Sequence, residues 1–368
     1  MLKFNILFNL CYNEDSKVGD FMRNNKILGV IVFIMLCIFG VLLFLFLQKD
    51  EPKENKKEEE IKEDTVVEVK KLKIVNEDSN SRNYAVMINN HDKARTNHAG
   101  LEDAYIVYEA IVEGGLTRMM AIFKDKETAR IGSIRSSRHY FLDYAMENDA
   151  IYIHFGWSPQ AQSDIKSLGI NNINGLYDNI FWRDYSLGVA QEHTAFTKME
   201  SIKDYSEKKG YRTTSDKELL LNYNVDEVNI NEKEGAISTN QIDIVYSAYV
   251  TSSYTYDSQN KVYLRSVNGT PHMTSDENKN KTQITVKNII IADMNNYSID
   301  SYGRQNLSNI GSGSGYYITN GYAVPIQWFK DSRSSQTIYK YLDGSEIQVN
   351  DGNTYIQLHP SNQNVNIS

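Results

Sequence analysis

Cysteine is nearly absent from this chain of 368 residues. The two cysteines, Cys11 and Cys37, both precede residue 48, so the rest of the chain contains none. Disulfide bonds, thiolate nucleophiles and cysteine metal sites are therefore excluded from most of the protein. Proline is also scarce, with 5 residues, whereas 41% of the residues are hydrophobic. This balance excludes the collagen-like and wholly disordered classes of protein.

Basic residues are in the minority, with 39 Lys and Arg against 47 Asp and Glu, which gives a formal net charge of −8 at pH 7. A chain of this sign has no long-range positive field to gather nucleic acid, so we expect no nucleic-acid partner. None of the 7 histidines has the His-x-x-x-His spacing of zinc ligands. We therefore expect neither a metal nor another cofactor.

One long hydrophobic run interrupts this polar chain near its start. Residues 27–47 carry no charge, and at about 1.5 Å per residue a helix of this length spans a membrane. Arg23 and Lys26 precede the run, which places residues 1–26 in the cytosol. The pattern predicts a single-pass anchor in the cell membrane, with the chain from residue 48 onward outside the cell.

The run has two other interpretations, a cleaved signal peptide and a lipoprotein signal. A cleaved signal peptide would need a small-residue cleavage site, and none follows the run. A lipoprotein signal would lipidate Cys37, but the bulky Leu36 stands where a small residue is expected. The start of the chain also has two candidates, Met1 and Met22, and the sequence leaves both open.

Beyond the anchor, the composition divides the chain into three parts. Residues 48–80 are dominated by charged side chains and are expected to form a linker. Residues 81–225 alternate strand and helix patterns, which is typical of an α/β layered domain. Residues 240–362 carry strand patterns only and are expected to form an all-β domain, a small barrel or a sandwich. The fold class expected for the whole chain is therefore α+β.

In the first exterior segment, residues 81–225, hydrophobic periodicity predicts the strands and helices. The expected strands are 84–88, 106–112, 119–123 and 150–154, and the expected helices are 137–147 and 158–168. A third helix is expected to start at the capping box Thr197–Glu200 and to end before Gly210.

In the second exterior segment, residues 240–362, apolar and polar residues alternate with a period of two, for example at Ile242, Ile244 and Tyr246. Asn-Gly pairs at 268–269 and 320–321 are typical of tight hairpin turns between such strands. The glycine-rich run 311–315 lacks the lysine of a phosphate-binding loop, and we expect it to be a flexible connection.

A dense group of polar residues lies between residues 109 and 158. Arg135 and Arg138 flank Ser136 and Ser137 where a strand is followed by a helix. Guanidinium groups, hydroxyl groups and exposed backbone N–H groups could converge there on one phosphate or carboxylate. The alternative is structural: a serine caps the helix, and the arginines pair with nearby carboxylates.

This group supplies most of the candidate site residues. Glu109 and Glu113 are the candidates for a catalytic base. The candidates for ligand binding within the group are Arg118, Arg135, Ser136, Arg138 and His154.

Several segments, in order along the chain, resemble the YerB family of Gram-positive envelope lipoproteins. In the first half these are AVMINNHDKAR, GLEDAYIVYEAIVEGGLTRMMAIF, IGSIRSSRHYFLD and HFGWSPQA. In the second half they include YLRSVNGTPH and GYYITNGYAVPIQWFKDSR. The resemblance implies two domains of unknown function and adds Arg183 and His193 to the ligand-binding candidates.

Two functions follow from these features. The first is a non-catalytic envelope protein that binds an anionic cell-wall polymer, a lipid-linked precursor or another envelope protein through its arginines. The second is an enzyme of wall assembly, a transferase or hydrolase acting on a phosphorylated glycan or lipid-linked precursor. In the enzyme, arginines would stabilise negative charge while Glu109 or Glu113 acted as base.

Overall fold

The computed structural model describes residues 70–368. The predicted anchor 27–47 and most of the predicted linker 48–80 lie outside these residues. Within the described part of the chain, no helix is both long enough and apolar enough to cross a membrane. The fold is mostly β, with few helices.

The helices are short, and three of the four described ones lie at predicted positions, whereas α2 was not predicted. α3 and α4 confirm the helices expected at 137–147 and 158–168, and the third expected helix is α5. The predicted capping box does not form, because Lys198 is the N-cap of α5 and Thr197 ends a strand. The helices are α2 (Asp92–Arg95), α3 (His139–Glu147), α4 (Pro159–Ser167) and α5 (Met199–Lys208).

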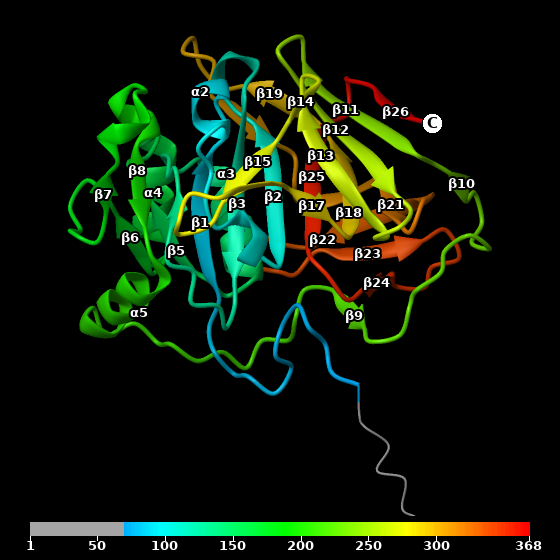
Figure 1. Cartoon of the computed structure of the whole chain (residues 1–368), viewed down its shortest axis with the longest axis horizontal. Helices are drawn as coiled ribbons and strands as arrows, with labels where there is room; N and C mark the ends of the chain where they lie inside the picture. Colours follow the sequence, from blue (N-terminus) through cyan, green and yellow to red (C-terminus); the bar gives the residue numbers. More distant parts are fainter. Residues whose placement is uncertain (1–69) are drawn as a thin grey trace, which may run out of the picture. The chain divides into compact units, whose positions relative to one another are not determined.

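One long sheet runs through the described chain (Figure 1). Its strand order is β10-β22-β21-β18-β25-β2-β3-β1-β5-β6, and β23 pairs with β22. The strands from the first segment are β1 (Tyr84–Asn89), β2 (Ile106–Ile111), β3 (Thr117–Phe123), β5 (Ile151–His154) and β6 (Asn172–Asn174). Those from the second segment are β10 (Ile237–Ser238), β18 (Asn288–Met294), β21 (Gly311–Thr319), β22 (Tyr322–Lys330), β23 (Ile338–Tyr341) and β25 (Thr354–Pro360).

A second sheet lies against one face of the long sheet. Its order is β14-β13-β12-β11-β26, and β17 pairs with β13. Ile242, Ile244 and Tyr254 from this sheet share a buried cluster with Ile88 and Met119 of the long sheet. These strands are β11 (Gln241–Ser247), β12 (Val250–Asp257), β13 (Val262–Val267), β14 (Thr270–Pro271), β17 (Thr285–Val286) and β26 (Val365–Ile367).

The other face of the long sheet is covered by α3. Tyr140, Phe141 and Tyr144 of this helix share a buried cluster with Met87 and Met120 of the sheet. Smaller pairings complete the fold. They join β4 (Ile131–Gly132), β8 (Ala195–Thr197) and β7 (Trp182–Arg183); β9 (Asn222–Asn224) and β24 (Gln348–Asn350); β15 (Met273–Ser275) and β16 (Lys281–Gln283); β19 (Asn296–Ser298) and β20 (Gln305–Leu307).

The two exterior segments share the long sheet. β25, near the end of the chain, lies between β18 and β2 and is parallel to both, and residues 69–368 form one compact unit. Most strands of the second segment are divided between the two sheets, and they do not close into a barrel of their own. Local periodicity predicts many of the strands, but it carries no information on which distant strand becomes a neighbour.

The glycine-rich run 311–315 is not the flexible connection that the sequence suggested, because it forms the first half of β21. At Gly315 a Cβ atom would lie 1.8 Å from the carbonyl oxygen of Ile291, and at Gly313 it would lie 2.6 Å from Nε1 of Trp328. These glycines allow neighbouring strands and a tryptophan ring to approach the backbone closely.

Candidate functional site

The carboxyl ends of several parallel strands meet at one edge of the long sheet. β1, β2 and β5 run in the same direction, while β3 runs antiparallel between β1 and β2. The ends of these three strands and the start of β3 therefore share one edge, which we call the carboxyl edge. Ligand sites in open α/β sheets form outside this kind of edge. In Figure 1 this is the end of β1 that leads into α2.

Three of the predicted arginines lie at the carboxyl edge. Arg118 is the second residue of β3, and Arg138 directly precedes α3. Nη1 of Arg118 donates to the carbonyl oxygen of Ser136 at 2.6 Å and lies 3.3 Å from its hydroxyl oxygen. Nη1 of Arg138 donates to the same hydroxyl at 3.1 Å. We call Arg118, Arg135, Ser136 and Arg138 the arginine site.

Two of these arginines have carboxylate partners. Arg138 forms a two-pronged ion pair with Glu113, with N–O distances of 2.6 and 2.8 Å. Burial opposes the ionised form of Glu113, but the hydrogen bonds and positive charge of Arg138, with a smaller attraction from Arg118, together lower the pKa of this carboxyl. Arg135 is a looser partner of Glu192, at 3.5 Å, and both side chains are partly exposed.

Arg118 differs from its neighbours because none of the described carboxylates lies within ion-pair distance of it. The residue is only 7% exposed. Burial, followed by repulsion from Arg138, lowers the pKa of its guanidinium to about 9, and attraction from Glu113 offsets only part of this shift. A buried cation without a direct ion-pair partner is costly, and this cost is typical of a position where a ligand supplies negative charge.

The start of α3 adds donors to the arginine site. Arg138 is the N-cap of this helix, and no side chain caps it. Of the structural alternative, the helix cap by Ser136 or Ser137 is therefore wrong, whereas the pairing of arginines with nearby carboxylates is present at Arg138 and Glu113. Uncapped N–H groups and the positive end of the helix dipole both favour a bound anion.

Glu109 does not belong to the arginine site, although the sequence grouped them together. Ala110, not Glu109, lies opposite Arg118 in the β2–β3 register, so alternation places Glu109 on the other face of the sheet. There it is fully buried and forms an ion pair with Arg265 at 2.6 Å. Its carboxylate also accepts hydrogen bonds from Asn90, Thr117 and Ser252. This enclosure leaves no path to a ligand, which argues against Glu109 as a catalytic base.

A chain of hydrogen bonds extends from Arg265. A guanidinium can only donate, so Nδ1 of His272 accepts from Nε of Arg265 at 3.0 Å. Nε2 of His272 then donates to Nδ1 of His98 at 2.8 Å, and Nε2 of His98 donates to the carbonyl oxygen of Asn89 at 2.6 Å. Burial lowers the pKa of His98 to about 3 and that of His272 well below its ordinary value. Both imidazoles are therefore neutral at pH 7.

We call Glu109, Arg265, His272 and His98 the buried network. It joins β2 of the long sheet to β13 of the second sheet, and thus one exterior segment to the other. The sequence analysis missed Arg265 and His98. Burial of Arg265 could have been suspected from its place in the alternating strand Val262–Val267, where every second residue is buried.

The remaining candidates lie around the arginine site. His154 is buried, and its ring nitrogens lie 2.8 Å from the carbonyl oxygen of Gly156 and 3.2 Å from Asn172. Burial lowers its pKa to about 4, so it is a neutral structural residue. His193 is also buried, 2.8 Å from Asn89 through Nδ1. Arg183 stacks on the Phe155 ring at 4.3 Å and is the most peripheral of the candidate arginines.

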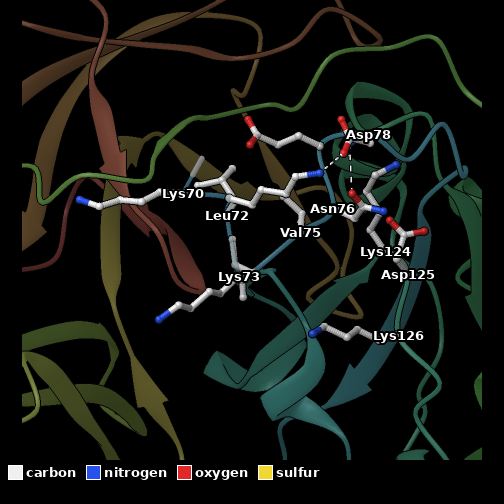
Figure 2. A pocket seen from close by; sticks show the side chains of 12 residues that line it. Lys70, Leu72, Lys73, Val75, Asn76, Asp78, Lys124, Asp125 and Lys126 are labelled. Atoms are coloured by element: carbon white, nitrogen blue, oxygen red, sulfur yellow. Dashed lines mark hydrogen bonds and ion pairs between the residues drawn. The ribbon is translucent and has the colours of Figure 1, made fainter. Parts of the chain in front are cut away.

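A lysine-rich cleft of about 400 Å³ lies at the opposite edge of the sheet (Figure 2). It is formed by residues 70–78 and 124–126. Lys70 and Lys71 are already paired, with Asp226 and Asp78, at 2.7 and 2.6 Å. Leu72 and Val75 are buried beneath them. We interpret these contacts as holding the segment that precedes β1 against the sheet.

Within residues 70–368, no three or more His, Cys, Asp or Glu side chains converge as metal ligands. The carboxyl edge gathers guanidinium groups, the Ser136 hydroxyl and the backbone N–H groups at the start of α3, which are donors suited to anion binding.

The comparisons with known proteins identify the family. Residues 72–212 match the N-terminal domain, and residues 242–356 the C-terminal domain, of the protein family of unknown function DUF3048. The chain is 31% identical over 293 residues to the putative lipoprotein YerB of Bacillus subtilis, which covers 78% of this chain and 84% of the relative.

A solved structure supports the same relationship. The crystal structure of the YerB protein from Bacillus subtilis is similar, with a TM-score of 0.67 and 29% identity. The match covers 78% of this chain and 94% of that one. The resemblance seen in the sequence is thereby confirmed, and the chain belongs to the YerB family.

Proposed function

We propose that this protein is an envelope-associated protein that binds an anionic cell-wall polymer or its lipid-linked precursor through the arginine site. Kinship to a putative lipoprotein supports the location. The observation that carries the binding proposal is Arg118, a guanidinium that is 7% exposed and has no described carboxylate within ion-pair distance. A phosphate or carboxylate on the ligand would supply a direct counterion.

Binding at the arginine site is better supported than catalysis in which Glu109 or Glu113 acts as a base. Glu109 is sealed in the buried network, and both oxygens of Glu113 are held by Arg138. A general base needs a free oxygen within hydrogen-bond reach of the proton that it abstracts. Neither glutamate offers one in this arrangement, so the role proposed for Glu113 is to position Arg138.

The arginine site lies far from the point at which the described chain begins. Residues 70–78 lie with Lys124 at the edge where β1 starts and β3 ends, and Arg118 lies at the other edge. β1 has six residues, so the two edges are about 20 Å apart. Figure 1 shows the blue segment before β1 at the end of the sheet away from α2. The site therefore points away from the segment that leads to the N-terminus.

Exchange of Arg135 tests this function. We expect Arg135→Gln to reduce retention of the protein on immobilised glycerol phosphate polymer, since it removes a partly exposed cation at the mouth of the site. The effect should shrink as salt rises from about 0.05 to 0.5 M, because exposed charges are screened. Arg212→Gln is the matched control, as this arginine is also exposed but pairs with Asp149 at the opposite edge. Equal retention of the two variants would contradict the proposal.

The mode of membrane association is part of the same proposal. We propose that residues 27–47 anchor the chain directly, since Leu36 precedes Cys37 where lipidation requires a small residue. Cys37→Ser should then leave the protein in the membrane fraction, and its apparent mass on a denaturing gel should not change. Release of this variant into the soluble fraction would show that a lipid on Cys37 holds the protein instead.

A further inference from the structure

A polar groove reaches the start of α3, the helix whose N-cap is Arg138 of the arginine site. It lies between the first turns of α3 and α4 and the β19–β20 hairpin, and its volume is about 670 Å³. His139, the first residue of α3, lines the groove and directly follows Arg138. The arginine site and the groove therefore both reach the start of α3, where a ligand of several units could contact both.

The floor of the groove is a fixed set of planar polar groups. Arg333 bridges Asp143 at 2.6 Å and Asp164 at 2.8 Å. Asn309 donates to the second oxygen of Asp143 at 2.9 Å, and Gln160 donates to Asp164 at 2.6 Å. Carboxylates, amides and a guanidinium held in place in this way offer donors and acceptors that need no rearrangement to receive hydroxyl groups.

The charge of the groove differs from that of the arginine site. Two carboxylates face one guanidinium on its floor, and the guanidinium is occupied by both of them. A second anion would be repelled there, whereas an uncharged group rich in hydroxyls would not. Apolar surface is also present at the rim, where Ile299 and Ile310 are each 42% exposed. Such side chains suit the C–H faces of a sugar ring.

We propose that this groove binds the uncharged saccharide part of a ligand whose phosphate or carboxylate occupies the arginine site. This inference rests on the proposed function and adds the ligand class: a phosphorylated or otherwise anionic saccharide. The anionic group is held by Arg118, Ser136 and Arg138, and the sugar hydroxyls contact the groove beside α3.

The test is a titration of the full chain in detergent with three defined probes. They are an N-acetylglucosamine tetrasaccharide 1-phosphate, the same tetrasaccharide without phosphate, and glycerol 3-phosphate. We expect the phosphorylated tetrasaccharide to bind at least about tenfold more tightly than either of the others, which is the effect of one or two well-placed groups. Equal affinity for the phosphorylated sugar and glycerol 3-phosphate would overturn the saccharide inference and leave the anion site intact. Absence of binding by both phosphates would overturn the proposed function itself.

Variants locate the sugar. The double exchange Gln160→Ala with Ile310→Ala should lower affinity for the phosphorylated tetrasaccharide about tenfold and leave affinity for glycerol 3-phosphate unchanged. Ile338→Ala is the matched control, because this isoleucine is 39% exposed on β23 and does not line the groove. If the double variant binds the phosphorylated sugar as the wild type does, the groove is not its site.

The same titration separates the two sources of such a ligand. A farnesyl pyrophosphate conjugate of the tetrasaccharide represents a lipid-linked precursor. Tighter binding of this conjugate than of the soluble phosphate identifies the precursor, and equal or weaker binding identifies the wall polymer. Both results support a saccharide in the groove, provided that the double variant weakens both probes.

Discussion

Replacement of Arg265 by methionine is expected to lower the free energy of unfolding by about 3–5 kcal/mol. Arg265 and Glu109 are both fully buried and joined at 2.6 Å. Removal of the cation leaves a buried carboxylate without its partner, and His272 loses the donor that fixes its tautomer. Chemical denaturation followed by tryptophan fluorescence measures the change.

Two further variants make this prediction specific. Arg304→Met should cost no more than about 1 kcal/mol, because Arg304 forms only a partly exposed ion pair with Asp300. The double variant Glu109→Gln with Arg265→Met leaves no unpaired charge. Its loss in the free energy of unfolding should therefore be smaller than the sum of the two single losses by at least about 1 kcal/mol. If Arg265→Met costs as little as Arg304→Met, the buried network does not hold the two exterior segments together.

Replacement of Arg118 by methionine is expected to separate binding from stability. Affinity for glycerol 3-phosphate or its polymer should fall at least about a hundredfold, because a charge-assisted contact at a buried position is lost. Stability of the free protein should stay unchanged or rise by up to about 2 kcal/mol, since a buried charge without a direct ion-pair partner is removed. The lost hydrogen bond to the carbonyl oxygen of Ser136 offsets part of this gain.

Arg118→Lys is the control for this variant. It keeps the positive charge but lacks the planar fork that reaches Ser136 and a ligand at once, so its affinity should lie between those of the wild type and Arg118→Met. The account of Arg118 as a ligand-binding group is contradicted if Arg118→Met destabilises the protein by about 3 kcal/mol and leaves anion binding intact. That pattern is typical of a structural residue.

Hydrophobic periodicity was sufficient to predict most local structure. The period of two at Ile242, Ile244 and Tyr246 predicts β11, in which buried and less buried residues alternate. The Asn-Gly pairs at 268–269 and 320–321 have positive φ angles at both residues, which tight hairpin turns require. Such signals are local, so one sequence suffices to read them.

Long-range pairing could not be predicted in this way. Nothing in the pattern of Thr354–Pro360 indicates that it lies between β18 and β2. The sequence placed Arg135, Ser136 and Arg138 together because they are close in the chain, and the structure has them at one edge of the sheet. Glu109 was grouped with them for the same reason, whereas its ion-pair partner, Arg265, is 156 residues away. A local stretch of sequence does not show which distant charged residue will become its buried ion-pair partner.

The crystal structure of the protein purified from its own membranes would test the central claim most directly. We predict electron density for a non-protein anion within about 3 Å of the Arg118 guanidinium and the Ser136 hydroxyl, with density for a sugar continuing past His139. A carboxylate of the chain itself seated on Arg118, with no additional density at the carboxyl edge, would contradict an anion-binding function for this site.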